Sequence, residues 1–221
     1  MSNILTIAYS TEGSTDQRFL LHIIRKTFEE IASNCKGQID VYDPVFIEFD
    51  KRNGFIEDFV DLSVKAFKNG INVLCIHADA DHNDDVQVIE DKISPAFKTV
   101  ENYATNQICK NLVAIVPVHM SEAWMLADKN LLKDEIGTDL SNQDLNITRH
   151  PESIADPKQT IESALNIAQK HLPNRRKRLT ISELYQPIGQ KISIEKLETL
   201  KSYKKFKLFV EEALRKINYL D

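Results

Sequence analysis

The chain has 221 residues, of which 42% are apolar and 28% charged, and its formal net charge at pH 7 is −5. This apolar content can offset the entropy lost on ordering a chain, so composition excludes a disordered protein. No run of about 18 apolar residues occurs, and the N-terminus shows no signal-peptide pattern, so we expect a cytoplasmic protein that does not contact membranes. Three scattered cysteines predict neither a disulfide framework nor a zinc site.

Charge is distributed unevenly along the chain. Residues 1–149 carry 14 Lys and Arg against 24 Asp and Glu, a net charge of −10, whereas residues 150–221 carry 14 against 9, a net charge of +5. An acidic region repels polyanions unless metal ions neutralise part of it, while a basic region can hold a phosphate backbone. Uneven charge is also common on protein surfaces without such ligands, so the asymmetry by itself favours neither interpretation.

Residues 1–137 alternate between strand-like and helix-like segments. A buried strand is expected at residues 4–9, and Ser14 with Gln17 forms a capping box that opens the first helix. The further expected elements are a strand within residues 39–49 interrupted by Pro44, a helix over 55–67, a strand over 71–76, a helix near 84–103 broken by Pro95 and capped by Asp84 or Asp85, a strand over 112–118 and a helix from 121 to Gly137. Such alternation predicts an α/β domain with a mostly parallel sheet between helices.

Residues 138–221 predict a helical appendage packed on that domain. Asp156 is placed to cap a helix that begins with Pro157 and runs toward Pro173. A basic run follows, and the segments 194–200 and 203–217 have helical spacing of apolar residues.

Acidic residues follow three of the predicted strands. Glu12 follows the first strand, Asp79 and Asp81 follow the third, and Glu122 follows the fourth. Ligands of open parallel sheets gather outside the carboxyl ends of the strands. Residues i and i+2 of a strand share a face, so Asp79 and Asp81 are expected to project together, and such paired carboxylates repel unless a cation compensates. Hard oxygen ligands predict Mg²⁺ or Mn²⁺ at this edge.

Each of these residues also has a structural interpretation. Aspartates in a D-x-D pair often cap the next helix, and Glu12 followed by Gly13 suits a simple turn. His77, His82 and His119 border the same edge and suit phosphate binding or proton transfer, but each equally suits a structural role. The printed sequence contains no P-loop, G-x-G-x-x-G or G-x-S-x-G motif, and no His pair has the spacing of a helical zinc site.

Two segments together resemble a known domain. They resemble the Toprim domain of topoisomerases, bacterial primases, ribosomal-RNA maturases and overcoming-lysogenisation-defect nucleases. The two segments are TIAYSTEG, a predicted strand followed by Glu-Gly, and VLCIHADAD, a predicted strand followed by D-x-D. More closely, the chain is similar to a family of small stand-alone Toprim-related bacterial proteins that are often encoded beside AAA- or ABC-type ATPases. The matching segments are STEGSTDQRFL, HADAD, VPVHMSEAWMLAD, DPKQTI and YQPIGQKISIEKLETLKSYKKF.

This resemblance implies a Toprim-like Rossmannoid fold and a Mg²⁺- or Mn²⁺-dependent phosphodiesterase, most simply a DNA or RNA endonuclease acting in phage defence with a partner ATPase. It implies that Glu12 is a metal ligand or general acid–base, that Asp79 and Asp81 are metal ligands, and that Glu122 is a ligand or supports the ligands. Met120 stands where the family more often has a second acid, so the number of metal ions, one or two, stays open.

The residues expected to hold a nucleic-acid backbone are His119 and the basic run Arg175, Arg176, Lys177 and Arg178. A solvated surface explains any single one of these positive charges equally well. Two other functions stay open: a non-catalytic Toprim-like subunit that regulates or senses for an ATPase complex, and an enzyme acting on a small phosphorylated metabolite. Contacts to several phosphates make affinity fall steeply with salt, which separates a polymeric substrate from a metabolite.

Overall fold

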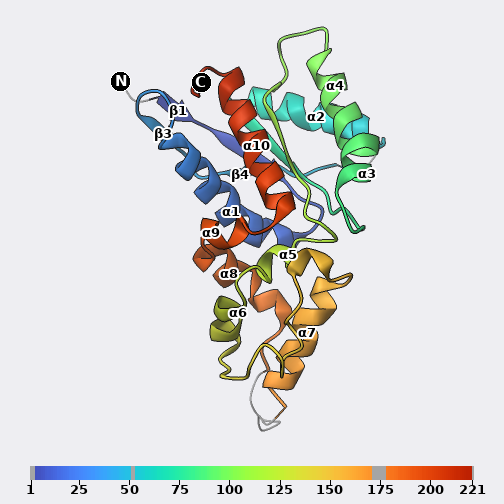
Figure 1. Cartoon of the computed structure of the whole chain (residues 1–221). Coiled ribbons are helices and arrows are strands. Elements are labelled where there is room, and N and C mark those ends of the chain that lie inside the picture. Colours follow the sequence, from blue (N-terminus) through green and yellow to red (C-terminus); the bar gives the residue numbers. More distant parts are fainter. Residues whose placement is uncertain (1–2, 51–52, 171–177, 221) are drawn as a thin grey trace.

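The computed structural model describes residues 3–50, 53–170 and 178–220, and it shows parallel strands between layers of helices (Figure 1). The strands are β1 (Asn3–Leu5), β2 (Ile7–Ser10), β3 (Ile39–Val41), β4 (Val45–Phe46), β5 (Val73–His77) and β6 (Leu112–Ile115). The helices are α1 (Ser14–Ala32), α2 (Phe55–Lys68), α3 (Val86–Val88), the π-helical turn η1 (Ile89–Ile93), α4 (Ser94–Glu101), α5 (Glu122–Met125), α6 (Lys129–Ile136), the 3₁₀ turn η2 (Pro151–Ser153), α7 (Pro157–Ala168), the 3₁₀ turn η3 (Ile181–Glu183), α8 (Tyr185–Lys191), α9 (Ile194–Leu197) and α10 (Lys201–Lys216). The predicted α/β class with a parallel sheet flanked by helices is confirmed.

The order of the strands creates a reversal in the middle of the sheet. Four parallel strands lie in the order β4–β2–β5–β6, and β1 pairs in parallel with β3. From β2 the chain crosses through α1 to β4 on one side, and then through α2 to β5 on the other side of β2. The strand order therefore reverses between β2 and β5, which is where open α/β sheets bind their ligands.

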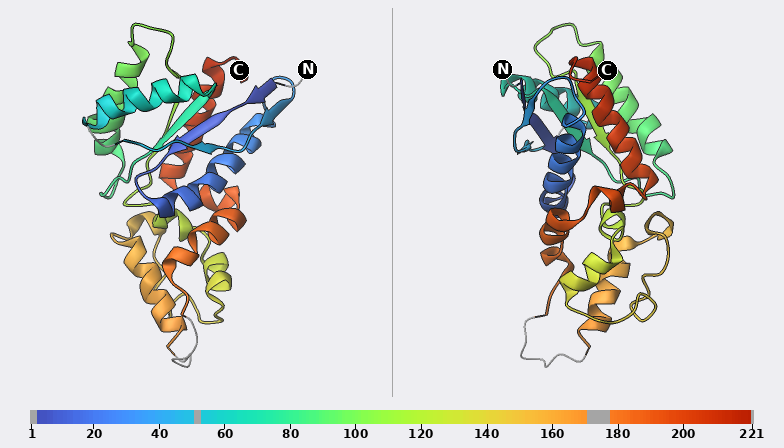
Figure 2. Two further views of the ribbon diagram at one scale, coloured as in Figure 1. Left: turned by 180° about the vertical axis from the view of Figure 1, so that it is seen from behind. Right: turned by 60° about the vertical axis from the view of Figure 1, so that its left-hand side comes forward.

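The two faces of the sheet pack into separate cores. Tyr9 and Cys75 belong to a core that also holds side chains of α1 and α10, whereas Ala8 and Leu74 belong to a second core beneath α2 and α4. Neighbouring residues of one strand enter different cores because successive side chains of a strand point to opposite faces. The views in Figure 2 show helices on both sides of the strands.

Helices α5 to α9 form a helical part that lies beyond the carboxyl ends of the strands (Figures 1 and 2). Helix α10 returns to the sheet and packs beside β6 and α1. Trp124 of α5 contacts Tyr203 and Phe206 of α10 at ring-centroid distances of 5.4 and 6.0 Å, and its Nε1 donates to Ser202 Oγ at 2.8 Å. The boundary between residues 137 and 138 stays a prediction. None of the helices in the described ranges has the length and apolarity needed to cross a bilayer.

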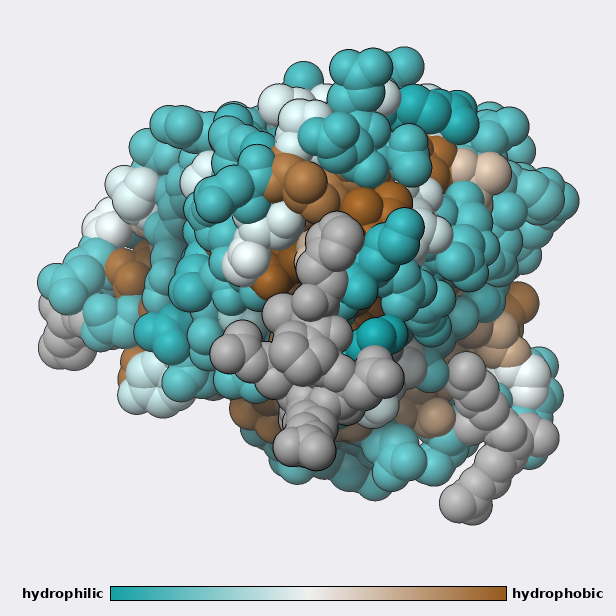
Figure 3. Space-filling view, turned by 90° about the horizontal axis from the view of Figure 1, so that it is seen from below, coloured by the Kyte–Doolittle hydropathy of each residue, from teal (hydrophilic) through white to brown (hydrophobic). Residues whose placement is uncertain are grey.

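The surface at the far end of the helical part is largely hydrophilic, with small separate apolar patches between the polar side chains (Figure 3). Scattered apolar side chains of this kind are normal on protein surfaces.

The start of α1 differs from the predicted capping box. Ser14 is already the first helical residue, the N-cap is Gly13, and this N-cap has no side-chain hydrogen bond. The hydroxyl of Thr11 donates to the Gly13 carbonyl at 2.8 Å, and a Cβ at Gly13 would lie 2.9 Å from Asp16 Oδ2. The carboxylate of Asp16 therefore fills the space above the turn that follows Glu12.

The segment predicted as one helix near residues 84–103, broken at Pro95, is a continuous helical run in which the π-helical turn η1 lies between α3 and α4. Pro95 stands in the first turn of α4, directly after η1, so the irregular turn lies where proline removes a regular helical hydrogen bond. Asp84 Oδ1 accepts a hydrogen bond from Val86 N at 3.1 Å, in agreement with a capping role. Asp85 makes no side-chain capping bond; its buried carboxylate pairs with Lys205 of α10. Capping by Asp85 was therefore a wrong expectation.

Helix α8 was not predicted, because its sequence contains Pro187 and Gly189, residues that usually interrupt helices. The C-terminal half of this helix is held against α1. A Cβ at Gly189 would lie 2.8 Å from the backbone oxygen of Phe19, so glycine permits the close approach of the two helices. Lys26 Nζ donates to the carbonyl oxygens of Gly189, Gln190 and Ile192 at 3.2, 2.6 and 2.8 Å, which satisfies the C-terminus of α8.

We expect Gly189→Ala to lower the free energy of unfolding by about 1–3 kcal/mol, because the added methyl group must push α8 away from the α1 backbone. Urea unfolding followed by circular dichroism measures the loss. The exposed neighbour Gln190 offers a matched control, and Gln190→Ala is expected to change stability by less than about 0.5 kcal/mol. Equal stability of the two variants would contradict the tight contact between α1 and α8.

Candidate functional site

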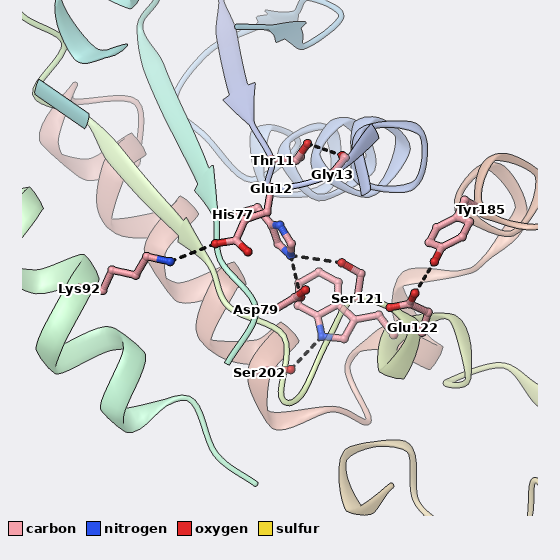
Figure 4. A network of polar contacts seen from close by, with 11 residues as sticks. Thr11, Glu12, Gly13, His77, Asp79, Lys92, Ser121, Glu122, Tyr185 and Ser202 are labelled. Carbon is pink, nitrogen blue, oxygen red and sulfur yellow. Dashed lines mark hydrogen bonds and ion pairs between the residues drawn. The ribbon is translucent and has the colours of Figure 1, made fainter. Parts of the chain in front are cut away.

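Glu12, His77 and Asp79 come together at the carboxyl edge of the sheet (Figure 4). β2 and β5 are hydrogen-bonded neighbours, and Ser10 at the end of β2 stands opposite Ile76 of β5. Glu12 follows β2 by two residues, while His77 ends β5 and Asp79 lies just beyond it. The pairing of these two strands thus carries the three side chains to the reversal point of the sheet.

His77 is buried and connects two loops. Its Nε2 lies 3.2 Å from Asp79 Oδ1 and 3.2 Å from Ser121 Oγ. Burial by itself lowers the pKa of His77, but the adjacent Asp79 carboxylate and the negative charges of Asp16 and Glu12 outweigh it and raise this pKa above its ordinary value.

Four buried side-chain atoms near this edge have no hydrogen-bond partner within the described residues: Ser10 Oγ, His77 Nδ1, Asp79 Oδ1 and His119 Nε2. Buried polar atoms without partners are rare in folded proteins and call for an explanation such as a water or an ion. Their concentration at the ends of β2, β5 and β6 distinguishes this edge of the sheet as a place suited to a polar ligand.

Glu12 lies at the mouth of a cavity of about 370 Å³. Its Oε1 pairs with Lys92 Nζ at 3.0 Å, and the same ammonium group lies 4.7 Å from the centroid of the Phe55 ring. Both partners of the ion pair remain about one-third exposed, with side-chain exposures of 38% for Glu12 and 35% for Lys92. Solvent screens such a pair, so it contributes little to stability and can be exchanged for other partners.

Asp81 does not share the position of Asp79. Strand β5 ends at His77, and Asp81 is an exposed residue in the left-handed conformation with φ 56°. Its N–H donates to the carbonyl of His119 at 3.0 Å, and His119 is left-handed as well, with φ 60°. The alternation continues beyond β5 through Asp79, because Ala78 N and Ala80 N still donate to the carbonyls of Ile115 and Pro117, each at 3.1 Å, and both side chains lie in the core beneath α2. The expectation that strand alternation carries both aspartates to one face was wrong at Asp81, where the positive φ ends the extended conformation. No polar contact joins Asp81 to Asp79 or Glu12 in the part of the chain that is described.

Glu122 is buried at the start of α5 and accepts a hydrogen bond from the hydroxyl of Tyr185 in α8. Burial raises the pKa of Glu122, the Tyr185 hydrogen bond opposes this rise, and the negative charges of Asp16 and Asp79 add to it. Burial and the Glu122 carboxylate also raise the pKa of Tyr185. Glu122 thus belongs to the same electrostatic environment as Asp79, but one of its oxygens is held by the helical part.

Among the described residues, no three His, Cys, Asp or Glu side chains are gathered into a group that could hold a metal ion. Mg²⁺ often takes only one or two protein carboxylates and completes its coordination with waters and substrate phosphate oxygens. Asp79, with a buried oxygen next to His77, and Glu12, at the end of the neighbouring strand, fit this second mode. Metal ligation by Asp81 and Glu122 stays a prediction.

The residues predicted to hold a phosphate backbone are only partly described. His119 is buried, and Arg178 is exposed beyond the end of α7. Arg175, Arg176 and Lys177 lie outside the described residues. Their role stays a prediction.

Four contributors to the site escaped prediction: Asp16, Lys92, Ser121 and Tyr185. Asp16 follows the Glu-Gly turn closely in sequence, and an acidic residue so near that turn could have been recognised as a candidate site residue. Lys92 and Tyr185 are far from their partners in sequence and contact them only through the packing of η1 and α8, for which no local pattern gives a signal.

Comparison with known proteins gives one match. The family model described as "Domain of unknown function (DUF4276)" matches residues 11–211, from the residue before Glu12 into α10. No curated protein and no solved structure matches the chain.

We expect Tyr185→Phe to destabilise the protein by about 1.5–3 kcal/mol near neutral pH, because the buried carboxylate of Glu122 loses a donor. The pKa of Glu122 is raised in the folded chain, so folding favours the protonated form of this carboxyl group. The resulting stabilisation is fully present below the unfolded pKa of about 4.3 and is lost as the pH rises through the folded pKa. The Tyr185 hydrogen bond limits that loss, so the variant should be more destabilised at about pH 7 than at about pH 4.

Urea unfolding at the two pH values measures this difference, and Tyr103→Phe, at an exposed tyrosine, serves as the control. A loss that is the same at both pH values would show that the hydroxyl of Tyr185 does not act on an ionised Glu122.

Proposed function

We propose that this chain, which belongs to the DUF4276 family, is a Mg²⁺- or Mn²⁺-dependent phosphodiesterase, most simply a DNA or RNA endonuclease of Toprim type. One observation carries the proposal: a buried carboxylate oxygen of Asp79, 3.2 Å from the imidazole of His77, lies at the reversal point of the sheet, beside the strand end that carries Glu12. Carboxylates placed there suit a hard divalent cation, and the Toprim resemblance of the Glu-Gly and D-x-D segments supports the same chemistry.

Asp79 and Glu12 are the residues that would hold the metal ion. A bound Mg²⁺ or Mn²⁺ polarises the scissile phosphate and stabilises negative charge on the attacking and leaving oxygens. The side chain of Glu12 is about one-third exposed and therefore accessible to water, which suits it to orient an attacking water and accept its proton.

His77 and Ser121 are positioning residues in this proposal. The imidazole of His77 lies between Asp79 and Ser121, and all three are fixed by the buried end of β5 and the loop before α5. Fixing the Asp79 carboxylate in one orientation lowers the entropy cost of placing substrate and water around it.

The distribution of charge is consistent with a polymeric substrate. Residues 150–221 carry the excess of positive charge, and Arg178 is exposed at the end of the basic run 175–178. We propose that this run holds a nucleic-acid backbone while the sheet edge performs the cleavage. Action in phage defence, with an AAA- or ABC-type ATPase as partner, is the finer part of the proposal and is supported by the resemblance alone.

The first test is a cleavage assay on plasmid, linear duplex, single-stranded DNA and RNA, with Mg²⁺, Mn²⁺ or a chelator. We expect cleavage to require the metal and to fall at least about 100-fold in both Asp79→Asn and Glu12→Gln. Asp91→Asn, which changes an exposed carboxylate next to Lys92 in η1, is the matched control and should retain activity.

Cleavage that survives both substitutions would place the reaction elsewhere. Absence of cleavage on every substrate, including with a co-purified ATPase, would contradict the proposal and favour a non-catalytic regulatory or sensor subunit of an ATPase complex.

The second test addresses the basic run. We expect replacement of Arg175, Arg176, Lys177 and Arg178 by alanine to weaken duplex binding and to reduce the slope of log K against log salt by about 3, because each phosphate contact releases counterions. Fluorescence anisotropy over a salt series measures the slope. A control with lysine at the three arginine positions keeps the charge and should keep the slope. An unchanged slope in the alanine variant would exclude the run from the interface.

A further inference from the structure

The cavity beside Glu12 has a composition that the proposed cleavage chemistry does not require. One wall is apolar and formed by Phe49, Phe55 and Ile76. The remaining lining groups are polar: Thr11, Glu12, Gly54, Asp58, His77 and Lys92. A volume of about 370 Å³ and an apolar wall with a few converging polar groups are typical of small-molecule sites.

The aromatic wall is held rigidly. The rings of Phe49 and Phe55 lie 5.5 Å apart between centroids, and Phe55 lies nearly parallel to Phe59 at 6.2 Å. Phe59 is completely buried in the core beneath α2, and Phe97 of α4 packs on its ring at 5.6 Å. The cavity wall is therefore the outer end of a row of packed rings and is already formed before any ligand binds, which lowers the cost of binding a flat apolar group.

Lys92 provides a cation at the same cavity. It stands on the π-helical turn η1, a type of turn that is rare and frequent at functional sites. Its ammonium group lies 3.0 Å from Glu12 Oε1 (Figure 4) and 4.7 Å from the centroid of the Phe55 ring. Both side chains of the pair with Glu12 are about one-third exposed. A terminal phosphate monoester carries more negative charge than one carboxylate and has more acceptor oxygens, so it can replace Glu12 as the partner of Lys92.

We propose that this cavity binds one nucleoside phosphate, with the base against Phe49 and Phe55 and the phosphate on Lys92. The wall suits a base because every base has an apolar face that stacks on aromatic side chains. The enclosed space takes a single unpaired base, whereas a base inside a duplex reaches such a pocket only after leaving its stack. Gly54 lines the cavity with φ 111°, a conformation that favours glycine, and it brings backbone close to the ligand without a side chain.

This inference rests on the proposed function in one respect, namely that Glu12 is released from Lys92 to act beside the cleaved bond. A phosphate on Lys92 releases the Glu12 carboxylate at the moment when substrate is bound. The cavity then selects unpaired nucleotides next to the reacting phosphate, so single strands, loops or ends are its substrate class.

The experiment is calorimetric titration in the presence of a chelator, which separates binding from any metal-dependent cleavage. The probes are the ribonucleoside and deoxyribonucleoside 5′-monophosphates, the corresponding nucleosides and inorganic phosphate. We expect at least one monophosphate to bind. Its affinity should exceed that of its nucleoside and that of inorganic phosphate at least about tenfold, because the nucleoside lacks the phosphate and inorganic phosphate lacks the base.

Two variants test the two halves separately. Lys92→Ala should weaken the monophosphate at least about tenfold and leave the nucleoside unchanged, because only the phosphate contact is removed. Phe55→Leu, which keeps an apolar side chain at the wall, should weaken both ligands. Lys98→Ala in α4 removes an exposed positive charge outside the cavity and should change neither. Circular dichroism confirms that each variant is folded.

Lack of binding by every monophosphate, or binding that Lys92→Ala and Phe55→Leu leave unchanged, would overturn the inference. Nucleotide binding by a protein that cleaves nothing would keep the inference and reject the nuclease. Cleavage without nucleotide binding would reject the inference and keep the nuclease. A 5′-phosphorylated single-stranded tetranucleotide that binds more tightly than the monophosphate identifies a strand as the source of the ligand, and equal affinity identifies a free nucleotide.

Discussion

The parallel pairing of β2 with β5 determines where the candidate site forms. The register is fixed at the start of both strands, where Thr6 N donates to Asn72 Oδ1 at 2.8 Å and Asn72 N donates to Thr6 Oγ1 at 3.0 Å. A slip of one residue would exchange the two faces of a strand and move Tyr9 out of its core. The same register sets how far Glu12 and His77 extend beyond the sheet edge, so the positions of these side chains depend on contacts at the opposite end of the strands.

The site concentrates negative charge in a poorly solvated region. The charges of Asp16 and Asp79 act on both His77 and Glu122, raising the pKa of each group, although burial alone would lower that of His77. Buried like charges are costly unless cations or hydrogen-bond donors compensate them. His77 and Tyr185 supply part of this compensation. A divalent cation or a protonated His77 would supply further positive charge. The concentration of acidic groups at this edge is therefore consistent with the proposed binding of a metal ion.

The apolar strands and some of the helix boundaries were predictable from the sequence, because buried strands and side-chain caps have local causes. The buried β5 was expected from its apolar sequence, and the N-cap of α7 from Asp156, whose side chain accepts from Gln159 N at 2.7 Å. The strand ends that carry Glu12 and Asp79 were predictable for the same reason. The left-handed conformation of Asp81 was not, because it depends on a hydrogen bond to a loop that follows another strand.

Helix α1 contacts both the sheet and the helical part, and through it the helical part influences the electrostatics of the candidate site. Its first turn follows Glu12 directly, and Asp16 from that turn acts electrostatically on His77 and Glu122. Further along, Lys26 holds the C-terminus of α8, the helix whose first residue, Tyr185, donates to Glu122. A displacement of α8 along α1 would therefore move the donor away from Glu122 and change the charge that Asp79 experiences. Residues on both sides of position 137 therefore contribute to the same electrostatic environment at this edge of the sheet.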